Sequence, residues 1–160
     1  MYALRKWSVR NAALLERFYD VAEPLLLACH PLWRILGYER LERPIAFVER
    51  QVKGLFFDCR MCGQCVLSST GMACPMNCPK QLRNGPCGGV REDGGCEVDP
   101  GLRCVWVEAT EGAARMRAGL ERIRLVQAPV DSQLQGRSTW LRVARLHGEA
   151  HDRSVANAPQ

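Results

Sequence analysis

The chain has 160 residues, of which 47% are hydrophobic and 24% are charged. This composition is ordinary for a globular protein and excludes wholesale disorder. The net charge of +5 is spread evenly, since residues 1–58, 59–104 and 105–160 carry an excess of two, one and two basic side chains. Nucleic-acid binders usually concentrate basic residues on one surface, so this distribution argues against a nucleic-acid partner.

No part of the N-terminal region has the pattern of a targeting or membrane segment. Residues 1–10 contain basic side chains, but no apolar run follows them as in a secretory signal. The apolar segment 24–36 is too short to span a bilayer and contains His30 and Arg34. We therefore expect a cytoplasmic protein with no membrane partner, in which clustered cysteines bind metal instead of forming disulfides.

Three helices are predicted ahead of the cysteines, over residues 8–22, 24–36 and 44–53. The second is apolar almost all the way round, as a helix is when it is buried on several sides. Near the third, apolar residues recur every three or four positions: Leu41, Ile45, Val48, Val52 and Leu55. Residues 1–58 are therefore predicted to be an apolar helical segment that docks a partner.

Eight of the nine cysteines lie between residues 59 and 104, spaced as C-x2-C-x2-C-x8-C-x3-C-x8-C-x8-C-x7-C. They are Cys59, Cys62, Cys65, Cys74, Cys78, Cys87, Cys96 and Cys104. Eight thiolates make two sets of four, and four thiolates complete either a structural zinc site or a cubane iron–sulfur cluster. A segment of this size buries too little apolar surface to fold by itself, so its folding should depend on the metal.

The opening of this block favours iron over zinc. Three cysteines within seven residues, ending at Cys65, resemble the start of bacterial ferredoxin sites, whereas zinc sites more often use separated pairs. Proline follows Cys74 and Cys78, as it follows the remote cysteine of the ferredoxin run. We expect two [4Fe–4S] clusters, and zinc, or one cluster plus one zinc, is the alternative. The ninth cysteine, Cys29, lies in an apolar stretch and is predicted to be a buried small hydrophobic residue.

Residues 105–147 are predicted to form two C-terminal helices, the first of which starts a few residues earlier. The first begins with Asp99 as N-cap, followed by a proline at the first helical position, and continues to about Gln127. The second covers residues 138–147. Residues 148–160 are polar and are predicted to be disordered. The predicted fold class is mainly α, with a small, loop-rich, metal-stabilised cysteine module and few or no strands.

No catalytic constellation is recognisable. The sequence has no glycine-rich dinucleotide loop, no Walker loop and no nucleophile elbow. The three histidines, His30, His147 and His151, lie outside the cysteine block and are each better explained as structural or solvated. The chain alone is therefore not expected to be a complete enzyme.

Five motifs carry a resemblance to a known family. They are Cys59-Arg-Met-Cys62-Gly-Gln-Cys65, Cys74-Pro-Met-Asn-Cys78-Pro-Lys, Leu82-Arg-Asn-Gly-Pro-Cys87-Gly-Gly, Cys96-Glu-Val-Asp-Pro and Cys104-Val-Trp. Over residues 15–110 the chain resembles the cysteine-rich C-terminal domain associated with methylenetetrahydrofolate reductases of bacteria and archaea. That domain occurs fused to the reductase barrel or in a separate accessory subunit.

The resemblance implies an accessory subunit whose partner is a flavin-containing methylenetetrahydrofolate reductase catalytic subunit. It also implies that iron–sulfur clusters in this chain relay electrons to or from the flavin of the partner, in one-carbon metabolism. By ferredoxin analogy, Cys59, Cys62 and Cys65 share one cluster with a remote cysteine, and the other cysteines form the second site. The alternative is a structural zinc-binding subunit that stabilises or regulates the reductase without redox activity.

Overall fold

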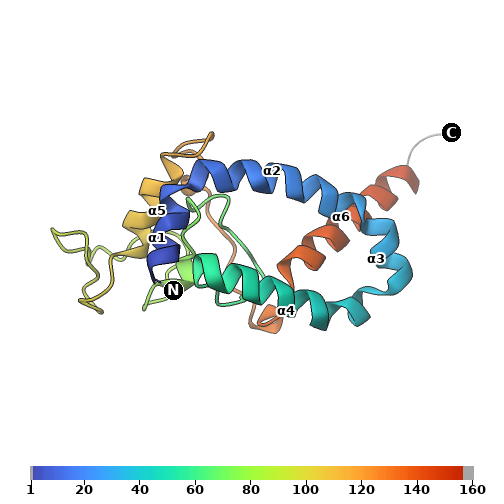
Figure 1. Ribbon diagram of the computed structural model, residues 1–160, viewed down its shortest axis with the longest axis horizontal. Helices are drawn as coiled ribbons and strands as arrows, with labels where there is room; N and C mark the ends of the chain where they lie inside the picture. Colours follow the sequence, from blue (N-terminus) through green and yellow to red (C-terminus); the bar gives the residue numbers. More distant parts are fainter. Residues whose placement is uncertain (1, 157–160) are drawn as a thin grey trace.

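The structure is a computed structural model that describes residues 2–156, with side chains from residue 3 to residue 153 (Figure 1). The α-helices of this part of the chain are α1 (Tyr2–Arg10), α2 (Ala12–Ala28), α3 (His30–Leu36), α4 (Tyr38–Phe57), α5 (Val105–Ala113) and α6 (Thr139–Ala156). Short 3-10 helices cover Pro75–Asn77, Arg122–Arg124 and Ser132–Leu134. Between residues 2 and 156, the β pairing consists of two isolated antiparallel bridges, Val90–Cys96 and Gly95–Arg103. The mainly α class with few or no strands is confirmed.

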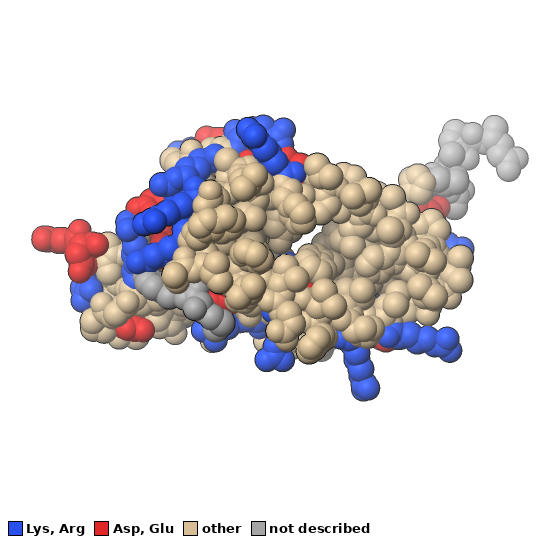
Figure 2. Space-filling model, viewed as in Figure 1, with Lys and Arg blue, Asp and Glu red and all other residues tan. Residues whose placement is uncertain are grey.

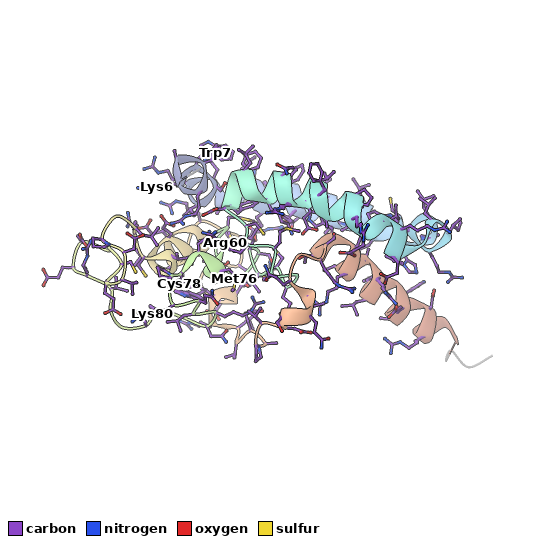
Figure 3. All side chains as sticks on the ribbon, turned by 90° about the horizontal axis from the view of Figure 1, so that it is seen from below. Lys6, Trp7, Arg60, Met76, Cys78 and Lys80 are labelled. Carbon is purple, nitrogen blue, oxygen red and sulfur yellow. The ribbon has the colours of Figure 1, made fainter. Side chains whose placement is uncertain are left out.

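The first four helices form one layer, and the cysteine segment, α5 and α6 lie against one side of it (Figures 1 and 3). Helix α1 packs against α4 and α5, and α6 packs against α2, α3 and α4. Trp7 lies on the outer side of this helical layer, whereas Cys78 lies on the side of the cysteine segment (Figure 3). The cysteine segment therefore has the helical layer as its base.

The helices α2 and α4 are longer than predicted, whereas the single buried helix predicted over residues 24–36 was wrong, because Cys29 divides this segment between α2 and the short α3, which has no buried residues. Helix α2 continues through Pro24, and α4 includes both Pro44 and Gly54, residues that the sequence suggested as helix boundaries. The ends of α3 and α4 lie at residues with positive φ. Gly37 (φ 84°) ends α3, and Asp58 (φ 50°) ends α4. Asp58 also turns the chain directly into the first cysteine.

The apolar stripe predicted near the third helix does not face the core. Val48, Val52 and Leu55 are 50%, 41% and 49% exposed. On the other side of α4, Glu49 and Lys53 are each only 1% exposed. The amphipathic pattern of α4 is therefore inverted, with a charged pair inside and apolar side chains outside.

Cys29 is exposed, so the prediction that it is a buried hydrophobic residue was wrong. It lies at the junction of α2 and α3, where its backbone N–H bonds to the carbonyl of Leu25. Neighbouring apolar side chains of this junction are exposed as well, among them Leu32 and Ile35. The junction therefore lies at the edge of the helical layer and not within a core.

The helix predicted from Asp99 to Gln127 was also wrong, because only α5 and one short 3-10 helix form there. The side-chain carboxylate of Asp99 accepts a hydrogen bond from the N–H of Gly101 (3.0 Å), and the backbone carbonyl of Asp99 accepts one from the N–H of Leu102 (3.0 Å). Asp99 thus closes a turn instead of capping a helix. Gly119, with φ 55°, lies in the left-handed region, which is incompatible with a continuing helix.

The last helix is longer than predicted, since α6 continues to Ala156. Residues 148–156 are therefore helical and not disordered, and residues 157–160 lie outside the described part of the chain. Two ion pairs support this extension. Arg145 pairs with Glu149 one turn later (2.9 Å), and Asp152 pairs with Arg34 of α3 (3.0 Å).

The buried apolar side chains form two clusters at the base of the cysteine segment. The first contains Ala12, Phe57, Leu67, Met72, Cys74 and Met116. The second contains Val9, Ala73, Val105, Trp106 and Ala109, with Cys78 and Cys104 packed against it. A buried ion pair between Arg5 and Glu108 (2.8 Å) links α1 to α5 beside these clusters. Cysteines are thus part of both clusters.

Candidate metal centre

Four of the predicted ligands, which follow the end of α4, interact electrostatically with one another. Burial, and then the negative charge of three other thiols, raises the pKa of Cys74 to about 12. Those thiols belong to Cys59, Cys62 and Cys65, so the four sulfurs lie within electrostatic range of one another. Burial is also the main cause that raises the pKa of Cys59 to about 11. Near neutral pH these two thiols are therefore protonated in the absence of metal, and metal binding has to displace their protons.

Unusual backbone conformations place these four sulfurs. Met61 (φ 50°) and Gly63 (φ 70°) have left-handed backbone between the first three cysteines, so the chain cannot continue as a helix. The N–H of Met61 donates to the sulfur of Cys59 (3.4 Å), and the N–H of Met76 donates to the sulfur of Cys74. Such N–H groups stabilise a thiolate more than a thiol.

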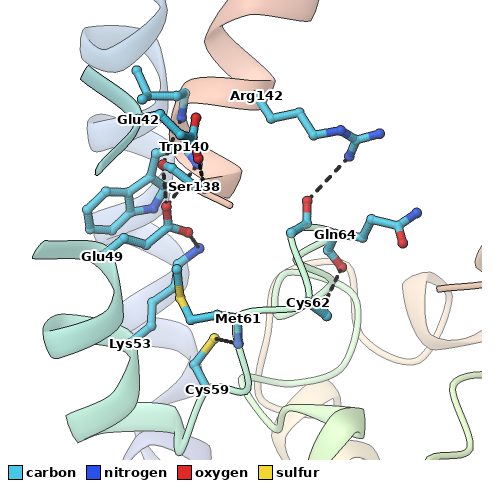
Figure 4. Close-up of polar contacts among 12 residues, drawn as sticks. Glu42, Glu49, Lys53, Cys59, Met61, Cys62, Gln64, Ser138, Trp140 and Arg142 are labelled. Carbon is cyan, nitrogen blue, oxygen red and sulfur yellow. Dashed lines mark hydrogen bonds and ion pairs between the residues drawn. The ribbon is translucent and has the colours of Figure 1, made fainter. Parts of the chain in front are cut away.

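A C-terminal strap, residues 131–142, crosses the loop that carries the first three cysteines. Four hydrogen bonds join the two segments: Gly136 N to Met61 O (2.7 Å), Gln135 Nε2 to Arg60 O (2.8 Å), Asp131 N to Gln64 Oε1 (2.7 Å) and Arg142 Nη1 to Gly63 O (3.5 Å; Figure 4). The contact is close, since a Cβ on Gly63 would lie 2.5 Å from the carbonyl oxygen of Leu134. The strap therefore covers the first cysteine loop.

A buried ion pair lies beside the four thiols. Lys53 Nζ is 2.6 Å from Glu49 Oε1 (Figure 4). The backbone carbonyl of Lys53 accepts a 3.3 Å hydrogen bond from the N–H of Cys59. Burial by itself would lower the pKa of Lys53, but the negative charges of Cys65 and Glu49 outweigh it and raise that pKa above its ordinary value. Lys53 is therefore a permanent cation within electrostatic range of this site.

The remaining four predicted ligands are less closely gathered. Cys78 and Cys104 pack against the same apolar cluster, and Cys78 also lines a cavity with Arg60 and Met76 (Figure 3). Cys96 lies on one of the β bridges. Cys87 is exposed, and its sulfur is 3.4 Å from Glu97, which also pairs with Lys80. The structure therefore places Cys78 and Cys104 against one apolar cluster and leaves Cys87 exposed.

Within the residues that the structure describes, no three Cys, His, Asp or Glu side chains form a group that could hold a metal ion as they stand. The set of Cys59, Cys62, Cys65 and Cys74 fits a four-thiolate centre in donor chemistry, in mutual range and in its N–H donors. The set of Cys78, Cys87, Cys96 and Cys104 fits in donor chemistry alone.

Sequence reasoning missed the ion pair and the strap. Glu49 and Lys53 carry a usable signal, since opposite charges four residues apart lie on the face of α4 opposite its apolar stripe. The usual interpretation of such a pair is a solvated face, which is the reverse of what the structure has. The strap has no hydrophobic period or motif that indicates its position.

Comparison with known proteins gives one result. A family model described as "Methylene-tetrahydrofolate reductase C terminal" matches residues 38–133, which include α4, all eight clustered cysteines and α5. No curated protein and no solved structure matches the chain. Among the described helices, none combines the length and the apolar character needed to cross a bilayer.

Proposed function

This chain belongs to the methylene-tetrahydrofolate reductase C-terminal family, and we propose that it is an accessory subunit of a flavin-containing methylenetetrahydrofolate reductase. In this proposal, iron–sulfur clusters held by the chain supply one-electron transfer to or from the flavin of the partner. The observation that supports the proposal is that Cys74, which belongs to a buried apolar cluster, lies within electrostatic range of Cys59, Cys62 and Cys65.

The residues around these thiols suit a redox centre. Phe57, Leu67 and Met72 are buried against Cys74 and keep water away from that side of the site. The N–H groups of Met61 and Met76 are placed at sulfur atoms, and such hydrogen bonds, like solvent exclusion, influence the reduction potential of a cluster. Cys65 is exposed, so the site also has a side that is open toward a partner.

The outer apolar face of the helical layer supports docking of the reductase subunit. We define this face by the exposed apolar residues of α2 and α4, which are Leu14, Phe18, Val21, Leu25, Phe47, Val48, Val52 and Leu55. The α2 members follow a helical spacing of three or four, so they form one stripe. Few charges interrupt the surface over α2 and α4 (Figure 2). A large exposed patch of this kind is typical of a protein–protein interface.

Two charges on this face should disrupt the complex. We expect Phe18→Asp combined with Val48→Asp to weaken binding to the reductase subunit at least tenfold, because each change puts a carboxylate into a desolvated contact. Isothermal titration calorimetry with the purified flavoprotein measures the effect. Val126→Asp is the control, since Val126 is 87% exposed but lies outside the layer. If the wild-type chain, the double variant and Val126→Asp all bound the reductase subunit with equal affinity, this face would be excluded as the interface.

Metal analysis of protein purified without oxygen tests the redox proposal. We expect about eight iron and eight sulfide per chain, as two [4Fe–4S] clusters require, and visible absorbance that bleaches on reduction. The reduced chain should then reduce the flavin of the reductase subunit in stopped-flow mixing. About two zinc per chain without visible absorbance would overturn the relay and leave the structural zinc subunit.

A further inference from the structure

The most unusual charged group of the molecule is the ammonium of Lys53. It is 1% exposed, and its ion-pair partner Glu49 is equally buried. Burying a charge is unfavourable unless other groups compensate it. A buried pair at this place therefore calls for an explanation beyond the ordinary surface pairing of residues four apart.

The carboxylate of Glu49 does not serve Lys53 alone, because it also accepts hydrogen bonds from the N-terminal end of α6. Oε1 of Glu49 accepts from Lys53, whereas Oε2 accepts from the hydroxyl of Ser138 (2.6 Å) and from the N–H of Trp140 (3.2 Å; Figure 4). Ser138 also caps α6, since its hydroxyl accepts the N–H of Leu141 (3.2 Å). The positive N-terminal end of α6 thus takes up part of the charge of Glu49.

Besides Glu49, two kinds of group lie near the ammonium of Lys53. On one side its ammonium lies 5.2 Å from the centre of the Trp140 ring, a favourable but weak contact. On the other side are the four thiols, to which α4 connects directly through the bond from Cys59 N to Lys53 O. Lys53 is within electrostatic range of both Cys59 and Cys65. The four thiols become thiolates when they bind a metal, and they are then a second anionic partner for Lys53.

We propose that Lys53 is the charge-compensating residue of the centre formed by Cys59, Cys62, Cys65 and Cys74. Four thiolates around a metal or a cluster leave a net negative charge, and a fixed buried cation stabilises it. Lys53 acts through its charge and is not a metal ligand. Where the centre is an iron–sulfur cluster, which rests on the proposed function, the same cation favours the reduced and more negative state and raises the reduction potential.

Two variants, compared with each other, isolate the charge of residue 53. Glu49→Gln retains the ammonium and most of the shape of the partner. Glu49→Gln combined with Lys53→Met removes both charges, so no buried ion is left alone. The two proteins differ only at residue 53, which carries a positive charge in the first and is neutral in the second. Far-UV circular dichroism of the full chains checks that both are folded.

The first measurement is the affinity of each full chain for Co²⁺ alone, followed by the thiolate-to-cobalt absorbance. We expect the double variant to bind Co²⁺ about tenfold more weakly than Glu49→Gln. Lys53→Arg, which retains the charge, should bind like the wild-type chain. Equal affinities of Glu49→Gln and the double variant would overturn the proposal, whatever metal the chain holds in the cell.

The second measurement is the reduction potential of the reconstituted iron–sulfur protein. A tenfold change in the equilibrium constant corresponds to about 59 mV for one electron, and we expect the double variant to lie lower than Glu49→Gln by about that amount. A wild-type chain that takes up no iron and sulfide would overturn the proposed relay alone, because the cobalt comparison still decides the role of Lys53. A cluster with the same potential in both variants would overturn the role of Lys53 alone.

Discussion

Cys74→Ala is expected to remove half of the iron and sulfide of the chain and to unfold much of the segment 59–104. The thiol of Cys74 lies with three others, and its side chain belongs to the buried cluster that contains Leu67 and Met72. Because the free energy of metal binding contributes to the folding of a small site, losing one of four ligands destabilises the whole segment. Iron and sulfide analysis, together with far-UV circular dichroism of anaerobically purified protein, measures both effects.

Two control variants separate the loss of a ligand from other effects. Cys29→Ala removes an exposed thiol at the junction of α2 and α3, and should change neither iron content nor helicity. Leu67→Ala opens a cavity in the same cluster at a cost of roughly 2–5 kcal/mol, but it retains all ligands and should retain the iron. A Cys74→Ala chain with its full iron content would contradict the assignment of Cys74 to the centre.

Gly71→Ala is expected to destabilise the folded chain by about 3 kcal/mol. Gly71 has φ 58°, and a Cβ there would lie 2.2 Å from the nitrogen of Ala113 and 2.4 Å from the carbonyl oxygen of Ala109. The opposing residue is also a glycine, since a Cβ on Gly112 would lie 2.0 Å from the Gly71 carbonyl oxygen. Positive φ costs a non-glycine residue roughly 1–2 kcal/mol, and overpacking adds roughly 1–3 kcal/mol.

Thermal unfolding of the metal-loaded chain measures this destabilisation. A loss of about 3 kcal/mol lowers the Tm of a chain of this size by roughly 6–12 °C. Gly119→Ala is the matched control, because Gly119 has φ 55° but no neighbouring atom within 4 Å of an added Cβ. It should lose only the backbone part, about 1 kcal/mol. If Gly71→Ala and Gly119→Ala lost equal stability, the close contact with α5 would not be the reason that residue 71 has to be glycine.

The fold class and the family could be predicted from the sequence, whereas several element boundaries could not. Helical periodicity indicated α2 and α4, but Pro24 and Pro44 were interpreted as helix starts although both lie inside helices. Asp99 followed by proline has the pattern of an N-cap, yet its carboxylate closes a turn. Local patterns indicate which conformations are possible, and packing against α1 and the bridges selects among them.

The candidate site shows the same division. The spacing of the first three cysteines predicted that they act together with a remote cysteine, and the structure places Cys74 in range of them. The roles of Glu49 and Ser138 could not be predicted, because the two residues are 89 positions apart and meet only when α6 packs on α4. Within α4, the opposite charges of Glu49 and Lys53 are visible in the sequence, but their usual interpretation is a solvated face, whereas α6 covers this face.

The sequence by itself determined the mainly helical class and the family, because helical periodicity and short cysteine spacings are local properties of the chain. Only the tertiary structure decided which side of α4 is buried and which remote cysteine lies within electrostatic range of the first three. Those outcomes depend on contacts between distant segments, in which α6 covers Glu49 and the strap covers the loop of Gly63. The free energy of such contacts comes from the assembled fold, so no single segment contains it.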